Sequence, residues 1–130
     1  ETLNGIEGIF YTKNSETNEY TLRMTDAAYK KLKEIKSKDV VAEFNKIIND
    51  IENYVTDIKY DEDFRTVNVF ADRKKIPEQF SDFDDTILSV MGSAMAYQIY
   101  TIEGQSVTIN VIYSDNNETF KTVSFPIIIE

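Results

Sequence analysis

The chain has 130 residues, of which 42% are hydrophobic and 12% aromatic, and these values predict one domain with enough apolar material for a core. Histidine and cysteine are absent, which excludes disulfides, thiolate nucleophiles, His-dependent catalytic triads and His- or Cys-ligated metals within this chain. The formal net charge of −9 disfavours nucleic acid as a partner, because phosphate backbones are bound through Lys and Arg.

The first predicted element is a β-hairpin. Residues 19–24 alternate between polar and apolar side chains, a period of two that is typical of a half-buried strand. A strand over residues 6–12 is expected to pair with it across the polar loop 13–18.

Two helices are predicted to follow this hairpin. Thr25 is a suitable N-cap, and a helix from there to about Lys36 places Asp26 near the positive end of the helix dipole. Over residues 40–55, apolar side chains recur every three or four positions, which predicts a second amphipathic helix.

A second hairpin and a further helix come next. Alternating segments flank the acidic turn 61–63, which is a hairpin signal. Ser81 is expected to cap a helix whose apolar stripe extends over residues 83–102, and Gly104 is the expected stop signal.

The chain ends in a third predicted hairpin, with strands over residues 107–113 and 119–128 joined by the turn 114–118. Pro126 cannot donate a ladder hydrogen bond, so that position is expected at an edge or a bulge. The element order ββ-α(α)-ββ-α-ββ predicts an α+β fold, with a largely antiparallel sheet built from three hairpins and the helices on one face.

Two shorter segments stand out. Residues 66–69 (Thr-Val-Asn-Val) resemble residues 108–111 (Thr-Ile-Asn-Val), which leaves either an internal duplication or a chance similarity. Residues 92–96 (Gly-Ser-Ala-Met-Ala) predict a helix surface that closely approaches the sheet or another helix, with Gly92 lowering local helix propensity by about 1 kcal/mol relative to Ala.

Carboxylates are the remaining candidates for catalysis. A pair of them about 5 to 9.5 Å apart is sufficient for glycoside hydrolysis. However, acidic turns also solvate hairpin ends, and aspartates favour helix starts, so we assign no catalytic residue. The two candidate clusters are Asp61, Glu62 and Asp63 in the second hairpin turn and Asp82, Asp84 and Asp85 at a helix start.

Neither a metal nor a cofactor is predicted. The turn 114–118 (Ser-Asp-Asn-Asn-Glu) offers oxygen donors for calcium but lacks the EF-hand spacing and glycine, so a hairpin turn that uses left-handed backbone angles is the simpler interpretation. The four glycines form neither a Walker A loop nor a dinucleotide-binding turn. The basic stretches 30–38 and 73–75 are interpreted as solvated faces.

The eight tyrosines could form a binding face, but core packing is the simpler interpretation. Tyr20, Tyr54 and Tyr60 fall on predicted core faces. Tyr97 and Tyr100 flank the buried stripe of the last helix.

The composition is typical of an exported protein from an AT-rich Gram-positive bacterium, because Ile, Lys and Asn are plentiful and cysteine is missing. The chain opens without Met and stops within the apolar run 127–129, so we interpret it as an excised piece of a longer exported protein. No apolar run approaches the roughly 20 residues of a transmembrane helix.

Our leading hypothesis is a non-catalytic interaction or structural domain of an exported or surface-anchored bacterial protein. It would bind a protein or a cell-envelope polymer and be a monomer or a weak homo-oligomer. The alternatives are an intracellular acidic inhibitor of the immunity type, which covers a basic toxin by charge complementarity, and a small carboxylate-dependent hydrolase.

Overall fold

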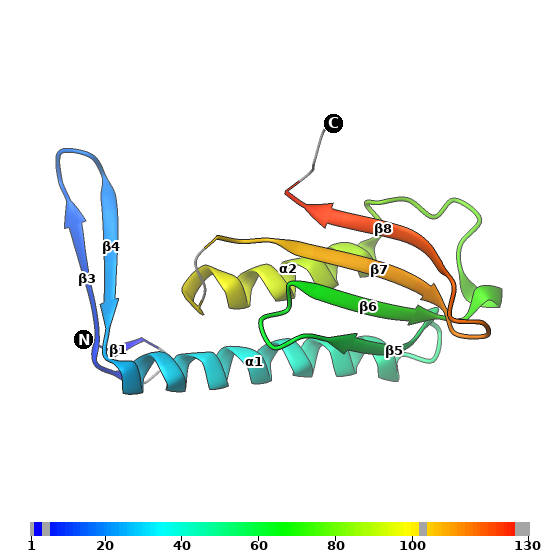
Figure 1. Ribbon diagram of the computed structural model, residues 1–130, viewed down its shortest axis with the longest axis horizontal. Coiled ribbons are helices and arrows are strands. Elements are labelled where there is room, and N and C mark those ends of the chain that lie inside the picture. The colour runs from blue at the N-terminus through cyan, green and yellow to red at the C-terminus, as the bar shows by residue number, and fades with distance from the viewer. Residues whose placement is uncertain (1, 4–5, 102–103, 127–130) are drawn as a thin grey trace.

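The computed structural model describes residues 2–3, 6–101 and 104–126, and it confirms the α+β class. Two helices cover one face of a four-stranded sheet, and a separate hairpin stands at one end of the molecule (Figure 1). The elements in chain order are β1 (Thr2–Leu3), β2 (Ile6–Glu7), β3 (Ile9–Asn14), β4 (Glu19–Met24), α1 (Asp26–Asn49), β5 (Val55–Tyr60), β6 (Thr66–Ala71), the 3-10 helix η1 (Arg73–Lys75), α2 (Asp85–Thr101), β7 (Val107–Tyr113) and β8 (Thr119–Phe125).

The N-terminal hairpin pairs as predicted, with β3 antiparallel to β4, but it forms its own two-stranded sheet. In Figure 1 it projects from the N-terminal end of α1, away from β5–β8. Ile9, Ala28 and Leu32 form a small core that fixes the hairpin to the helix. The backbone N–H of Thr25 also donates to the Gly8 carbonyl at 3.0 Å, and Gly8 has the positive φ of 89° that this tight approach requires.

The main sheet has the order β5-β6-β7-β8, and its two central strands are parallel. The other pairs are the predicted antiparallel hairpins. The central pair is parallel because η1 and α2 carry the chain back across the sheet between β6 and β7, which a short link cannot do. The similar segments 66–69 and 108–111 are neighbours in register within this pair, and their apolar residues at equivalent positions are all fully buried.

The prediction of two separate helices before β5 is wrong, because α1 is one helix of 24 residues. Thr25 caps it as predicted, accepting from the Ala28 N–H at 3.1 Å. No Gly or Pro interrupts residues 37–39, so nothing breaks the backbone hydrogen bonds there. The helix also ends earlier than predicted, since Asp50 leaves the helical region at φ −80° and ψ 101° and Val55 already begins β5.

The predicted start of α2 at Ser81 is also wrong, because the helix begins at Asp85. Asp84 performs the capping, with its Oδ2 accepting from the N–H groups of Thr86 at 3.1 Å and Ile87 at 3.4 Å. Within the segment 92–96, which was predicted to approach another element closely, Ala94 is fully buried in the main core, whereas Gly92 is exposed and a Cβ built there would meet no atom of another element within 4 Å. At its other end, α2 extends to Thr101 before Gly104, which has the left-handed φ of 75° expected of a stop signal.

The main core lies between the two helices and the sheet. Phe64 is its aromatic centre, with ring centroids 4.9 Å from Tyr97, 4.9 Å from Tyr60 and 6.0 Å from Phe44. Tyr97 and Tyr54 are buried, whereas Tyr60 is 43% exposed, so its predicted burial is wrong. The side chains of Tyr20 and Tyr100 lie outside the described residues. Within the described part of the chain, neither helix has the length and apolar character needed to cross a bilayer.

Candidate functional site

An apolar groove runs between the start of α2 and β8, with a volume of about 500 Å³. Three large apolar side chains beside it are unusually exposed: Phe83 is 74% exposed, Leu88 45% and Phe125 37%. Scattered single apolar residues are normal on a protein surface, but a cluster of them around a groove marks an interaction site. The groove is lined by Asp82, Phe83, Leu88, Met91, Thr122, Val123, Ser124 and Phe125.

The local sequence around α2 explains why apolar side chains face the solvent here. The turn that precedes α2 is closed by the Asp84 N–H, which donates to the Ser81 carbonyl at 3.1 Å. Phe83 lies inside this turn, before the helix starts. It is therefore not part of the apolar face of α2 that was predicted to bury it. Leu88 lies one turn into α2 on the side that faces β8 rather than the core.

The strand side of the groove is set by the register of β8. Val123 and Phe125 lie opposite Ile109 and Val107, which are both fully buried. Because side chains alternate along a strand, Val123 and Phe125 point toward the helix layer. β8 ends the strand order of its sheet and forms the upper edge of the sheet in Figure 1. It stops at Phe125, so Pro126 lies directly after the strand and not within it as predicted.

One ion pair lies beside the groove and includes the lining residue Asp82. The Lys121 ammonium lies 2.5 Å from the Asp82 carboxylate, and the two side chains are 35% and 53% exposed. Asp82 is the one charged side chain among the described lining residues. The groove therefore combines an apolar wall, a strand edge that no other described strand pairs with, and a single acid that is paired with Lys121.

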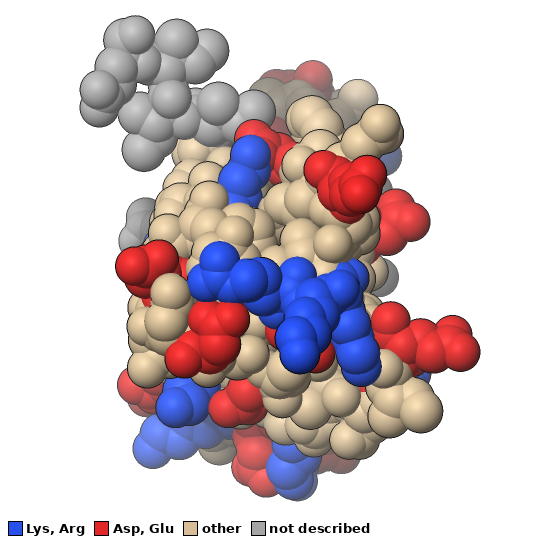
Figure 2. Space-filling view, turned by 90° about the vertical axis from the view of Figure 1, so that its right-hand side faces the viewer, with Lys and Arg blue, Asp and Glu red and all other residues tan. Residues whose placement is uncertain are grey.

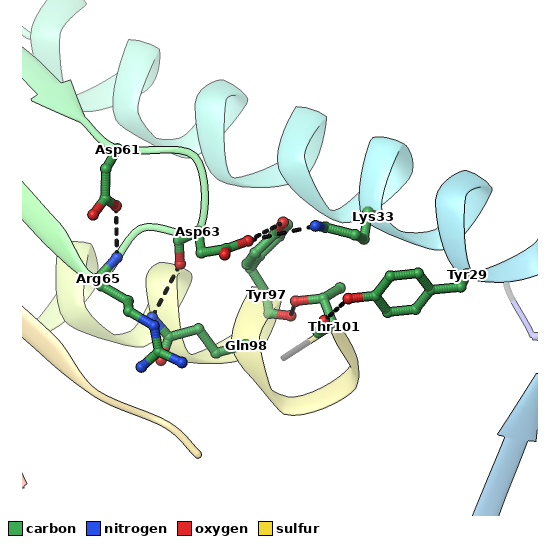
Figure 3. A network of polar contacts seen from close by, with 8 residues as sticks. All are labelled: Tyr29, Lys33, Asp61, Asp63, Arg65, Tyr97, Gln98 and Thr101. Atoms are coloured by element: carbon green, nitrogen blue, oxygen red, sulfur yellow. Dashed lines mark hydrogen bonds and ion pairs between the residues drawn. The ribbon is translucent and has the colours of Figure 1, made fainter. Parts of the chain in front are cut away.

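A network of polar contacts lies at the opposite end of α2 (Figure 3). The Tyr97 hydroxyl donates to Asp63 at 3.1 Å, and the Lys33 ammonium lies 3.6 Å from the same carboxylate oxygen. Burial raises the pKa of Tyr97, and its hydrogen bond to Asp63 raises it further. Desolvation alone lowers the pKa of Lys33, but attraction to Tyr97 and Asp63 outweighs it and raises that pKa above 10.5.

The same network fixes the ends of the helices to the sheet. The Tyr29 hydroxyl donates to the Thr101 carbonyl and so joins the start of α1 to the end of α2. The Gln98 side-chain amide donates hydrogen bonds to the Asp63 carbonyl, in the turn between β5 and β6, and to the Ser106 carbonyl, just before β7. These contacts connect the two helices to each other and to the sheet, and their donors all have partners. We therefore interpret the network as stabilising the fold and not as a binding site.

The two acidic clusters predicted as catalytic candidates do not converge. Asp63 contacts Tyr97 near the end of α2, whereas Asp84 caps its start. At 1.5 Å per residue the two clusters are about 18 Å apart, which exceeds the spacing that a carboxylate pair needs. Within the first cluster, Asp61 accepts from the backbone N–H groups of Arg65 and Thr66, so it closes the hairpin turn.

The basic stretch 73–75 is engaged in local contacts. The Arg73 guanidinium bonds both carboxylate oxygens of Asp115, at 2.9 and 3.2 Å, and lies 3.6 Å from the Tyr113 ring centroid. Lys75 donates to the Ile51 carbonyl at 2.7 Å. Figure 2 shows this end of the molecule, where Lys and Arg gather in the middle and acidic side chains lie around them. The mixed charges support the predicted solvated face.

At the turn 114–118, the carboxylate that a calcium site would need is already engaged by another side chain. Asp115 is held by Arg73, whose hydrogen bond lowers the pKa of that carboxyl. Asn117 adopts a left-handed φ of 61°, as expected of a hairpin turn. Among the described residues, no group of three or more acidic side chains is arranged to hold a metal ion.

Tyr54 gives a testable pH dependence. Its hydroxyl donates to Asp84 at 2.5 Å, and burial together with this bond raises the pKa of Tyr54 far above its ordinary value of 10.0. Above about pH 10, the tyrosine hydroxyl is deprotonated in the unfolded chain but stays protonated in the folded chain. The free energy of unfolding therefore falls as the pH rises. In Tyr54→Phe we expect the fall to be shallower by up to about 1.4 kcal/mol per pH unit, measured by urea unfolding. The exposed Tyr60→Phe is the control, and an equal effect there would contradict the assignment.

The sequence matches no protein family model, and comparisons with the curated proteins and with the solved structures found no significant match. Sequence reasoning missed the groove, because it placed Phe83 and Leu88 in one buried stripe. The available signal was Pro126, which left an edge or a bulge as the alternatives for the last strand, and β8 is an edge strand.

Proposed function

We propose that this chain is a non-catalytic interaction domain that binds a segment of another protein in the groove between α2 and β8. The observation that carries the proposal is the joint exposure of Phe83, Leu88 and Phe125 around a groove of about 500 Å³. Exposed aromatic and aliphatic side chains beside a pocket are typical of the centres of protein interfaces.

Of the two partner classes in our leading hypothesis, a protein and a cell-envelope polymer, a protein segment is the better match to this groove. Leu88, Met91 and Val123 offer apolar contacts, which suit aliphatic or aromatic side chains better than sugar or phosphate groups. The wide separation of the two acidic clusters supports binding over hydrolysis. The composition supports an exported or surface-anchored bacterial protein, and export remains part of the proposal.

The test is a selection of short peptides from a random phage-displayed library on the purified chain, followed by affinity measurement with synthetic peptides. Leu88→Asp places a charge on the groove wall and is expected to weaken selected peptides by about tenfold or more. Ile99→Asp is the matched control, because Ile99 is an exposed apolar residue of the same helix, at 54%, and does not line the groove.

The outcomes separate the classes of function. Peptides that bind the original chain and Ile99→Asp equally, but not Leu88→Asp, support the proposal. Equal loss in both variants, or selection of no peptide, contradicts it. Binding of purified teichoic acid or peptidoglycan fragments that is lost in Leu88→Asp would assign the groove to an envelope polymer instead. Circular dichroism of both variants verifies that each is folded.

A further inference from the structure

We propose that the partner binds as an extended strand from a basic protein, pairing with the free edge of β8 and placing apolar side chains in the groove. This inference rests on the proposed function, because it specifies how a protein segment occupies the same groove. It names the backbone conformation, the side-chain pattern and the charge of the partner.

The outer edge of β8, which no other described strand pairs with, favours an extended conformation of the partner. β8 pairs with β7 on one side and ends the strand order, so alternate residues direct their N–H and C=O groups away from the sheet. The β8 residues that line the groove, 122–125, pair in regular register with β7, and the bulge lies before them at residues 119–121. A partner strand would therefore meet an undistorted edge along the groove.

The side-chain pattern of the partner follows from the two faces of β8. Val123 and Phe125 point toward the helix layer, so every second partner residue would enter the groove and contact Leu88. On the other face, the Thr122 hydroxyl donates to the Asn110 side chain at 3.0 Å, next to the polar side chain of Ser124. The segment that fits is an alternation of apolar and small polar residues.

Charge favours a basic partner over a second copy of this chain. The full chain carries a net charge of −9, and this overall charge is the source of the attraction, because Asp82, the charged group among the described lining residues, is already paired with Lys121. A segment with Lys or Arg is therefore attracted, whereas two copies of the chain repel each other.

The probe is the synthetic peptide Lys-Val-Thr-Leu-Thr-Val-Lys, labelled for fluorescence anisotropy. Backbone groups of alternate residues face the same side of a strand, so N-methylation of one alternate set removes the hydrogen bonds to β8 and methylation of the other set faces solvent. We expect one methylated peptide to lose about thirtyfold or more in affinity and the other to stay within about threefold.

Variants of the chain test the site and the charge with the same probe. Leu88→Asp is expected to weaken the probe by about tenfold or more, with Ile99→Asp unchanged. Asp82→Asn leaves the Lys121 ammonium without its carboxylate beside the groove, so it is expected to weaken the basic probe by about threefold to tenfold, and Asp85→Asn, an exposed acid at the start of α2 outside this groove, is the control. A peptide with Glu in place of both Lys should bind more weakly than the probe.

Failure of this inference is distinguishable from failure of the proposed function. Library peptides that depend on Leu88 but tolerate both methylation patterns, or that bind as helices by circular dichroism, overturn strand pairing and leave the groove assignment intact. Insensitivity of every peptide to Leu88→Asp overturns both. A dimer in sedimentation equilibrium that dissociates in Leu88→Asp would identify a second copy as the occupant and overturn the basic partner.

Discussion

Replacing Gln98 with Leu is expected to destabilise the fold by about 3 to 4 kcal/mol, which is one of the largest effects available from a single polar side chain. Gln98 is fully buried, and its Nε2 donates to the carbonyls of Asp63 at 3.1 Å, Phe64 at 3.3 Å and Ser106 at 2.9 Å. Its Oε1 accepts from the Ser106 N–H at 3.0 Å. The substitution leaves these backbone groups without partners in a site that excludes water.

The measurement is urea-induced unfolding of Gln98→Leu, with the exposed Gln105→Leu as the control. A loss below about 1 kcal/mol in Gln98→Leu would show that water or relaxation replaces the missing bonds. Gln98→Glu refines the test, because a carboxylate would face the three carbonyl oxygens and its pKa would be raised. The buried carboxylate destabilises the fold at a pH above the pKa that the carboxyl has in the unfolded chain, and protonation removes this destabilisation as the pH falls. The difference in unfolding free energy between Gln98→Glu and the unsubstituted chain should therefore shrink between about pH 7 and 5.

Replacing Phe64 with Ala is expected to cost about 3 to 4 kcal/mol. Phe64 is 1% exposed and contacts Tyr60, Tyr97 and Phe44, so its removal leaves a cavity between the sheet and both helices. The exposed Phe83→Ala is the control for loss of a phenyl ring and should change stability by less than about 0.5 kcal/mol. Comparable losses in the two variants would contradict the assignment of Phe64 to the centre of the core.

The backbone of Phe64 adds a second expectation. Its φ is 57°, in the left-handed region, and its N–H donates to the Asp61 carbonyl at 3.2 Å within the β5–β6 turn. Glycine usually destabilises a folded protein relative to alanine, but a positive φ reverses this preference. Phe64→Gly should therefore be at least as stable as Phe64→Ala in the same unfolding experiment. A clear disadvantage of glycine would mean that the turn relaxes when the ring is lost.

The hairpins were predictable because strand pairing between neighbours in sequence depends on local patterns. Alternation around the turn 61–63 and around 114–118 identified β5–β8, and the left-handed Asn117 matches the turn chemistry predicted there. Thr25 was identified as the cap of α1 for the same reason, since a cap bonds the N–H of a residue within one turn.

The functional site was not predictable in the same way. Phe83, Leu88 and Ile99 share the apolar character of the residues that α2 buries, and periodicity alone cannot separate a wide buried stripe from a stripe with exposed margins. The sequence also could not predict that Asp63 and Asp84 lie at opposite ends of α2, because this depends on which end of the helix each turn contacts.

The sequence by itself determined the α+β class, the three hairpins and the chemistry that the chain lacks, because composition and short-range periodicity fix these properties. Only the tertiary structure decided that β6 and β7 are parallel, that the first hairpin stands apart, and that a groove opens between α2 and β8. These features depend on which elements distant in sequence bury one another. That outcome is set by the shared core around Phe64 and not by any local signal.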